Sequence, residues 1–349
     1  MNQLLQQLTE AVGVSGGEKE VRLLLRDLIA DHVDEWSVDA MGNLLATKRG
    51  TGAMDMRVLV DAHMDEVGLL ISEIESGGML RFDTVGGFDD RALLGKVVQI
   101  GPQKVIGVIG ARAIHLLKSG EYGKTVKADA MRIDIGAKNK DGAAAKVKVG
   151  DYAAFVTAYE ENAAAGGRIA IGKAFDNRAG CAALVELLRG ERFPFDLVAA
   201  FTVQEEVGLR GAKIAAYSTR PDAALVLECT PAYDLPSEAD ASPNVALGWG
   251  ASVYVMDART IQAPRLVAHL TRTADARGIA YQIRQPGGGG TNTGAIQRGA
   301  AGIPVATLAV PGRYAHTPTM MISLDDYDSV VLLAETALRG LTPEIVRHS

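Results

Sequence analysis

Two adjacent carboxylates, Glu205 and Glu206, stand where a buried strand should end. An apolar run, residues 197–203, precedes them, and a helix-like segment begins near Leu209. Successive side chains of a strand point to opposite sides of a sheet, so both carboxylates can face one cavity only if the backbone turns there. Such a turn would allow one carboxylate to bind a metal ion while its neighbour holds an attacking water. Taken alone, the pair is more simply explained as two solvated charges at a helix start, where the helix dipole favours anions.

Around this pair the chain alternates between predicted helices and strands. Helices are predicted over residues 2–12, 18–33, 178–189, 211–218, 262–277, 293–298 and 324–341. Strands are predicted over residues 57–62, 196–203, 223–227, 280–284 and 304–310, with a hairpin over 35–48 that turns at 41–43. This alternation is typical of an α/β fold with a mostly parallel or mixed sheet and helices on both faces.

The stretch from residue 68 to residue 165 has a different texture. Its predicted elements are short strands separated by glycine-containing turns, as over 97–100, 104–109, 131–135 and 151–156. Such spacing predicts a small β-barrel or sandwich. We therefore expect a discontinuous α/β domain, residues 1–66 and 166–349, and an inserted β-barrel domain, residues 67–165.

Side chains that can bind metal ions follow several of the predicted strands. Open α/β sheets bind ligands beyond the carboxyl ends of their strands. Those positions hold His63, Asp65, Glu205, Glu206, Glu228 and His316, and Asp176 precedes a helix. Singly, each has a simpler explanation, such as a buried core histidine for His63 or a helix N-cap for Asp176. It is the joint pattern that indicates a shared site.

The chemistry of this set suits two divalent metal ions, because imidazole and carboxylate together bind zinc, cobalt or manganese. The hypothesis takes as ligands His63, Asp176, Glu206, Glu228 and His316. Asp176 is the best candidate for a bridging ligand, since it lies between the two halves of the chain. Asp65, two residues from His63, would accept the second imidazole N–H. A bridging hydroxide would be the nucleophile, because such a metal pair lowers the pKa of bound water toward about 7.

Four motifs carry a resemblance to a known family: residues 63–68 (HMDEVG), 172–178 (GKAFDNR) and 205–211 (EEVGLRG), together with the distal His316. With the glycine-rich segment at residues 288–294, they resemble the M42 family of glutamyl aminopeptidase-like, tetrahedral metallopeptidases. The resemblance covers essentially the whole chain. The long gap between Asp65 and Asp176 fits as well, because M42 proteins insert a β-domain there.

The resemblance implies roles for these residues. His63 and Glu228 would hold one metal ion, Glu206 and His316 the other, and Asp176 would bridge. Glu205 would be the general base that passes a proton to the leaving amine. The substrates would be peptides with a free N-terminus. The inserted domain would make dimer contacts, and six dimers would form a hollow tetrahedral dodecamer.

Two residues depart from the family pattern. Glu228 stands where the family usually has Asp, which keeps the carboxylate chemistry and adds one methylene. Asn292 stands where the glycine-rich segment usually has Asp, which removes one negative charge. We expect either change to alter the metal preference or the specificity.

Composition excludes several classes of protein. The net charge of −6 gives no support for nucleic acid or a membrane as a partner. With only two cysteines, Cys181 and Cys229, a disulfide framework is not expected. No signal peptide or bilayer-spanning run is recognisable, so a cytoplasmic location is expected.

Other functions use similar residues. A di-metal deacylase or carboxypeptidase would need the same ligands, and a non-catalytic metal-binding shell would keep them without turnover. A glycoside hydrolase is disfavoured, because its two carboxylates should flank the sugar bond roughly 5 to 10 Å apart. Glu205 and Glu206 are instead neighbours in sequence.

Overall fold

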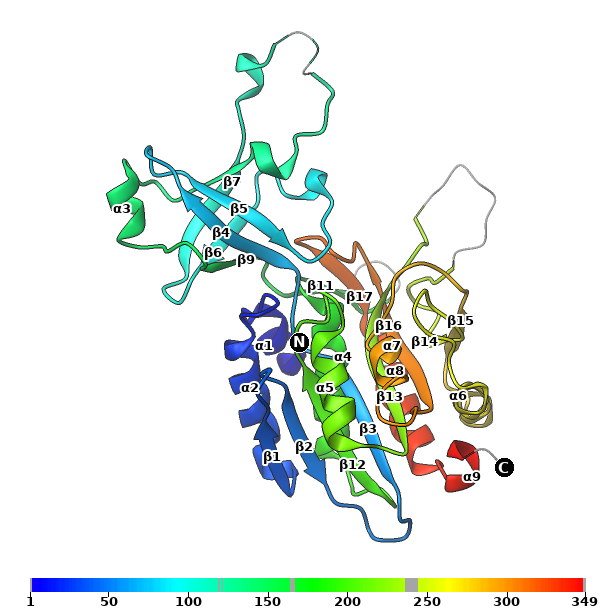
Figure 1. The fold of residues 1–349 in the computed structure, drawn as a ribbon. Coiled ribbons are helices and arrows are strands. Elements are labelled where there is room, and N and C mark those ends of the chain that lie inside the picture. The colour runs from blue at the N-terminus through cyan, green and yellow to red at the C-terminus, as the bar shows by residue number, and fades with distance from the viewer. Residues whose placement is uncertain (1, 119, 121, 164–166, 236–243, 348–349) are drawn as a thin grey trace.

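The computed structural model describes residues 2–118, 120, 122–163, 167–235 and 244–347, which form a large mixed sheet covered by helices and a separate closed barrel (Figure 1). This arrangement confirms the predicted fold class. Within the described residues no helix is both long and apolar enough to cross a lipid bilayer.

The large sheet has eleven strands. Nine follow one path, in the order β1 (Glu35–Val38), β2 (Leu44–Lys48), β12 (Asp196–Thr202), β3 (Arg57–His63), β13 (Ala223–Pro231), β16 (Val305–Arg313), β17 (Met320–Ser323), β11 (Ile169–Gly172) and β10 (Glu160–Asn162). Off this path, β14 (Ala251–Tyr254) pairs with β16 and with β15 (Tyr281–Arg284). Strands β12, β3, β13 and β16 run parallel, so their carboxyl ends meet at one edge.

Four strands of this sheet, β10, β11, β14 and β17, lie outside the predicted elements. Each has only three or four residues. Runs of this length carry only a weak hydrophobic period. β10 pairs with β11 and β16 pairs with β17, each with its neighbour along the chain, whereas the β11–β17 and β14–β16 pairs join segments that are distant in sequence.

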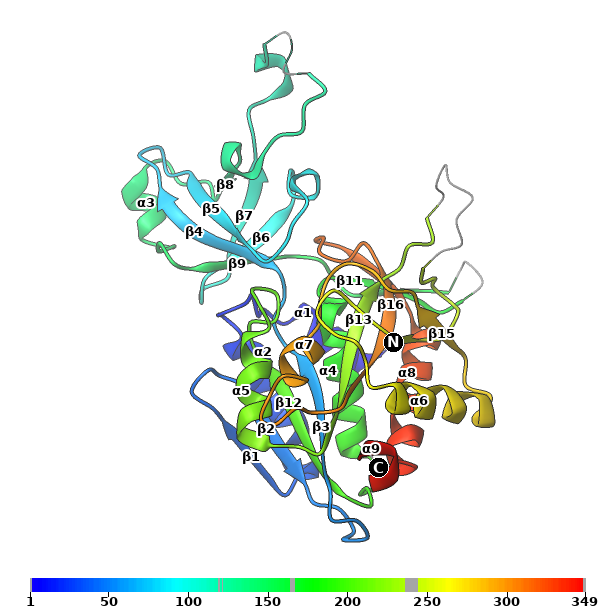
Figure 2. The ribbon, with the colours of Figure 1, turned by 45° about the vertical axis from the view of Figure 1, so that its right-hand side comes forward.

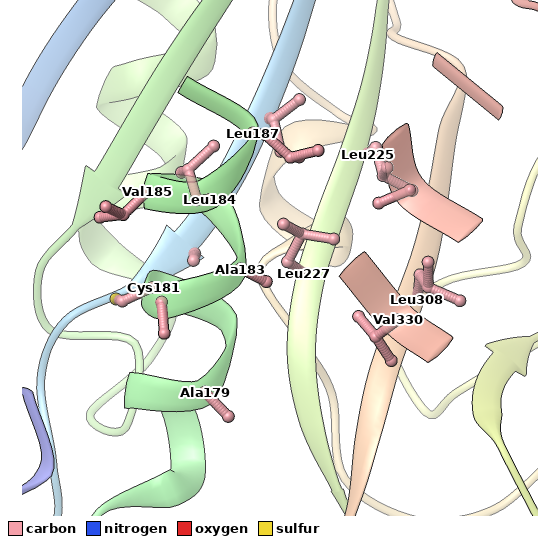
Figure 3. Close-up of a cluster of buried hydrophobic side chains, with 14 of the residues drawn as sticks. Ala179, Cys181, Ala183, Leu184, Val185, Leu187, Leu225, Leu227, Leu308 and Val330 are labelled. Atoms are coloured by element: carbon pink, nitrogen blue, oxygen red, sulfur yellow. The ribbon is translucent and has the colours of Figure 1, made fainter. Parts of the chain in front are cut away.

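Helices cover both faces of the sheet. One face packs against α1 (Gln3–Glu10), α2 (Lys19–Ile29), α4 (Phe175–Arg189), α6 (Pro264–Arg277) and α8 (Leu324–Arg339), with the short α9 (Pro343–Val346) at the end. The other face packs against α5 (Arg210–Thr219) and α7 (Thr293–Ile296). Figure 3 shows the first face, where Leu187 of α4 and Leu227 of β13 lie between the helix and the strand. These contacts hold α4 firmly against the central strands.

The barrel closes in the order β4 (Gly68–Ile74), β5 (Leu80–Val85), β8 (Arg132–Asp134), β7 (Val105–Gly110), β6 (Val97–Ile100) and β9 (Tyr152–Phe155). It is thus a barrel and not a sandwich. A short helix, α3 (Lys140–Ala144), precedes β9. Because β3 leads directly into β4, the barrel stands beyond the carboxyl edge of the large sheet, at the top of Figures 1 and 2.

Candidate metal centre and its cavity

Polar side chains gather on one face of the central strands, where the strands end. Alternate residues share a face. On the face toward α5 and α7, apolar residues give way to polar ones in the series Leu59-Asp61-His63, Val198-Ala200-Thr202 and Val226-Glu228-Thr230. The apolar members anchor the strands, and the polar members form a floor at the carboxyl edge of the sheet.

His63 ends β3, and Asp65 fixes the orientation of its ring. His63 Nδ1 lies 3.2 Å from the Asp65 carbonyl oxygen and 3.4 Å from Asp65 Oδ1. The Asp65 carboxylate also accepts hydrogen bonds from Ser15 Oγ at 2.6 Å and from the backbone N–H groups of Glu205 and Glu206 at 3.0 and 3.2 Å. Asp65 therefore joins the end of β3 to the turn after β12 and leaves His63 Nε2 to face the floor.

The backbone turns between β12 and α5, as two adjacent carboxylates in one cavity require. Gln204 has φ +56°, in the left-handed region. The carboxylates of both Glu205 and Glu206 can place an oxygen within 4.8 Å of each other and of a His63 ring nitrogen. Ala174 and His316 also have left-handed backbone, with φ of +54° and +58°. Such residues cost about 1–3 kcal/mol each and cluster at functional sites.

Asp176 sits at the start of α4, but it does not cap that helix. Its φ of −83° and ψ of 104° are non-helical, and so are those of Asn177. Asn177 does the capping instead, because its Oδ1 accepts a hydrogen bond from the Gly180 N–H at 3.0 Å. The Asp176 carboxylate is thereby free to point into the cavity, where its side chain is 12% exposed.

The five residues predicted as ligands come together as two groups that share Asp176. In the first group, His63 Nε2 lies 3.2 Å from Asp176 Oδ1 and 3.5 Å from Glu228 Oε2. In the second, His316 Nε2 lies 3.6 Å from Asp176 Oδ2 and 3.2 Å from Glu206 Oε2. Each Asp176 oxygen thus faces a different histidine, and the longer Glu228 side chain still reaches the first group.

The two groups differ in access to solvent. The side chains of His63 and Glu228 are 2% and 4% exposed, whereas His316 is 43% exposed. The barrel borders the second group, because a Cβ added at Gly87 would lie 3.4 Å from His316 Nδ1. The inserted β-domain therefore takes part in shaping the site, which the strand pattern did not predict.

Without a metal ion the floor has an excess of carboxylate charge. Burial raises the pKa of Glu205, Glu206 and Glu228 well above the usual range, and neighbouring carboxylates add to the rise. Burial disfavours a charged His63, but Glu228, Asp176 and Asp65 outweigh it and hold the pKa of His63 well above its usual value. These carboxylates are therefore poised to take up a cation.

The donor set fits divalent metal ions. Two imidazoles and three carboxylates supply the nitrogen and oxygen ligands that zinc and similar ions prefer. Glu228 Oε2 is buried and has no hydrogen-bond partner within the described part of the chain. Burying a carboxylate oxygen without a hydrogen bond or a coordinating ion costs free energy.

Directly behind this floor lies a second buried charge cluster, which the sequence analysis missed. Glu66 accepts hydrogen bonds from Lys173 Nζ at 2.7 and 2.8 Å and from Arg178 Nη2 at 3.1 Å. Lys173 Nζ also donates to the Ala11 carbonyl at 3.0 Å, and Arg178 Nε donates to the Met64 carbonyl at 2.9 Å. Because Lys173 and Arg178 flank Asp176, this cluster fixes the segment that carries Asp176. Paired residues this far apart leave no local pattern in a sequence.

Asn292, the second departure from the family pattern, lies in another buried polar contact. Its Nδ2 donates to Asp61 Oδ2 at 2.8 Å and to Thr202 Oγ1 at 2.9 Å. Burial raises the pKa of Asp61 to about 6. Asn292 therefore supports the glycine-rich segment from beneath and is 1% exposed.

A cavity of about 1120 Å³ opens over the floor. Its lining includes all five predicted ligands, Glu205 and the glycine-rich segment. It also includes five cationic side chains, Arg210, Lys213, Arg259, Arg284 and Arg298. The cavity is large enough for an extended peptide end, and it combines an acidic floor with a cationic wall.

Nearly the whole chain is similar to known aminopeptidases. The model of the M42 glutamyl aminopeptidase family matches residues 42–333. Glutamyl aminopeptidase of Lactococcus lactis is 30% identical, over 97% of this chain and 94% of that protein. Lysyl aminopeptidase of Pyrococcus furiosus is 28% identical, over 98% of this chain and 97% of that protein.

Solved structures of TET peptidases have the same fold as this chain. A TET aminopeptidase from a marine sediment Thaumarchaeota archaeon superposes with a TM-score of 0.93 at 34% identity, covering 99% of this chain and 97% of that one. The TET1 peptidase of Pyrococcus horikoshii, which can assemble into a tetrahedron or a large octahedral shell, has a TM-score of 0.85 at 33% identity. It covers 97% of this chain and 99% of its own.

Proposed function

The chain belongs to the M42 family of aminopeptidases, and on this premise we propose that it removes N-terminal residues from peptides with the help of two divalent metal ions. M42 enzymes are metal-dependent peptide-bond hydrolases, so the reaction class follows from the family. The observation that supports two ions is the pair of ligand groups that share Asp176.

In this proposal His63 and Glu228 would hold one ion, Glu206 and His316 the other, and Asp176 both. Zinc is the expected metal, with cobalt or manganese as alternatives. The chemistry that such ions supply when bound is a lowered pKa of water and stabilisation of negative charge on the scissile carbonyl oxygen.

Glu205 is the proposed general base. Its carboxylate is 8% exposed, lines the cavity and belongs to neither of the two ligand groups around Asp176. It would take a proton from the attacking water and give it to the nitrogen of the leaving amine. Burial raises its pKa, which makes the carboxylate a stronger base than an exposed glutamate.

Asp65 is the proposed positioning residue for this chemistry. It touches the His63 ring and both backbone N–H groups of the Glu205–Glu206 turn. It would therefore hold one ligand and the base in a fixed relation.

We also propose that residues 67–165 form an inserted domain for self-association, and that residues 1–66 and 166–349 form the catalytic domain. Support comes from apolar side chains exposed on the barrel, such as Ile106 at 56% and Val149 at 61%. The assembly would be a dimer that builds a dodecamer. Ile106→Glu should lower the sedimentation coefficient, whereas Leu332→Glu, at an exposed position of α8, should leave it unchanged.

The function is tested with aminoacyl-p-nitroanilides, each with and without an acetylated N-terminus. The metal-free enzyme is first reloaded separately with zinc, cobalt or manganese, and bound metal is measured. We expect cleavage of the free-amine substrates alone. Cleavage of only the acetylated substrates would indicate a deacylase, and absence of turnover on these compounds and on longer peptides, with two ions bound, would indicate a non-catalytic shell.

A further inference from the structure

The cationic side chains of the cavity wall form no ion pair among the described residues, and the carboxylate of Asp257, which also lines the cavity, accepts hydrogen bonds from the Arg259 backbone N–H and from Thr291 Oγ1. Arg210, Lys213, Arg259, Arg284 and Arg298 all line the cavity, and no ion pair between described residues includes any of them. Arg210 and Arg298 instead bond to neutral oxygens, Gln204 Oε1 at 3.2 Å and the Gly294 carbonyl at 2.7 Å. A wall of unpaired cations attracts an anionic group into a cleft.

Arg284 differs from the other four because it is buried, at 3% exposure. Its Nε donates to Thr230 Oγ1 at 3.2 Å, and its Nη2 donates to the Gly288 carbonyl at 3.1 Å. Its Nη1 is buried and has no hydrogen-bond partner among the described residues. A guanidinium cannot lose its charge in a protein, so this nitrogen lacks the acceptor that burial calls for.

The strands hold Arg284 rigidly. Arg284 and Tyr254 are register partners on the parallel pair β14 and β15, and the guanidinium carbon lies 4.4 Å from the centre of the Tyr254 ring. Stacking on an aromatic ring fixes the plane of a guanidinium and leaves its edge free for a carboxylate. Arg284 is thus preorganised before any substrate arrives.

The strands also place Arg284 beside the metal floor. Its partner Thr230 is two residues beyond Glu228 on β13, so the two side chains share one face of that strand. The residue whose amine binds at the floor carries its side chain on the adjacent carbon. A carboxylate at the end of that side chain is therefore the substrate group best placed to reach Arg284.

We propose that this cavity selects peptides whose N-terminal residue is acidic, with Arg284 pairing with its side-chain carboxylate and the four exposed cations drawing it in. The inference rests on the proposed aminopeptidase function. The family does not fix the sign of the preferred side chain, since relatives of similar distance are a glutamyl and a lysyl aminopeptidase. A lysyl side chain at this wall would meet the like charge of Arg284 and of the four exposed cations, against the one carboxylate of Asp257 in that part of the lining.

The first test uses the wild-type enzyme on peptides X-Ala-Ala and Ala-X-Ala, with X as Glu, Gln or Lys. Glu and Gln have nearly the same shape, so their ratio isolates the charge. We expect kcat/KM for Glu over Gln to be at least about tenfold at the first position and about one at the second. A ratio of one or less at the first position, with turnover intact, overturns the inference alone, as does an acidic preference found only at the second position. Absence of cleavage of every peptide overturns the proposed function instead.

The second test removes the charge. Arg284→Gln should reduce the Glu-to-Gln ratio at the first position to about one, and Arg284→Lys should restore part of it. Arg277→Gln removes the same charge from the exposed end of α6, outside the cavity lining, and should leave the ratio unchanged. A ratio that survives in folded Arg284→Gln overturns the assignment to Arg284.

A binding measurement separates recognition from turnover. In the metal-loaded Glu205→Gln background, calorimetry should show Glu-Ala-Ala binding at least about tenfold more tightly than Gln-Ala-Ala, and Arg284→Gln should remove this difference. Equal affinities for the two peptides in that background would overturn the inference.

Discussion

Two buried charge clusters lie back to back in this molecule, and only one of them is complete. In the cluster of Glu66, Lys173 and Arg178, two cations surround one carboxylate and the neighbouring backbone carbonyls take the remaining N–H groups. In the cluster around Asp176, carboxylates outnumber the cations that the chain supplies, and Glu228 Oε2 has no hydrogen-bond partner among the described residues. In the first cluster the folded chain itself supplies the partners of every charge, whereas the second cluster needs a bound ligand to balance its carboxylates.

The difference shows how to separate structural charge from functional charge in a buried region. A structural cluster should lose stability when one member is neutralised, because its partners remain buried without a counter-charge. A functional cluster should lose ligand binding or chemistry instead. The following predictions test this division.

Neutralising the shared ligand should have the largest effect. Asp176→Asn should lose metal and activity together, because an amide is a poor bridge between two cations. Metal content measured by elemental analysis, together with turnover of the preferred substrate, checks this. Full occupancy with two ions per subunit in this variant would show that Asp176 is not a bridge.

Neutralising the base should come next. Glu205→Gln should lower kcat by about 10²–10⁴-fold, the usual contribution of a general acid or base, while two ions stay bound. Glu191→Gln, at an exposed position after α4, serves as the matched control and should keep full activity. If Glu205→Gln also lost both ions, Glu205 would be a ligand and not the base.

Breaking the complete cluster should change stability more than chemistry. Lys173→Met leaves Glu66 with one cation and should lower the free energy of unfolding by about 3–5 kcal/mol. Urea denaturation measures this, with the exposed Lys146→Met as the control, expected within about 0.5 kcal/mol of the wild type. If stability were unchanged and metal affinity fell instead, the two clusters would form one functional unit.

The pH dependence of the metal-free protein should show the smallest and most graded effect. Glu205, Glu206, Glu228 and His63 all have folded-state pKa values well above their usual ones, so the folded protein binds more protons than the unfolded chain. The stability that these raised pKa values contribute is fully present below about pH 4.5 for the glutamates and below about pH 6.5 for His63. It is lost as the pH rises through the raised pKa values of the folded protein. Asp61, whose pKa is raised from 3.8 to about 6, likewise makes the folded protein less stable as the pH rises through that range.

We therefore expect the free energy of unfolding of the metal-free protein to fall between about pH 5 and pH 8, by up to about 1.4 kcal/mol per pH unit for each extra proton bound, and the melting temperature to fall with it. Scanning calorimetry with and without metal checks this, since bound ions should flatten the decline. A metal-free protein that becomes more stable across this range would contradict the excess of carboxylate charge.

Much of the fold and of the candidate site could be predicted from the sequence, because both follow local patterns. The hairpin of β1 and β2, the parallel core strands and the barrel agree with the apolar periods of those segments. The proximity of His63, Glu206, Glu228 and His316 followed from a rule about strand ends, and the structure brings them together. Their roles as ligands stay predictions.

What the sequence could not predict depends on contacts between distant residues. The Glu66 cluster joins residues 107 and 112 positions apart, and no local signal marks such a pair. The same holds for Arg284, whose significance appears only once Tyr254 and Thr230 surround it. The approach of the barrel to His316 likewise depends on how two domains pack.

The uneven exposure of the two histidines bears on the order in which metal ions would bind and dissociate. His316 is 43% exposed and His63 is 2% exposed, so one ligand group opens to solvent while the other is sealed behind it. If these groups hold the two proposed ions, the ions should load and leave in sequence, the inner one first in and last out. A chelator would produce a half-loaded enzyme long before an empty one, and exchange in a mixture of metals would yield enzymes with a different element in each position.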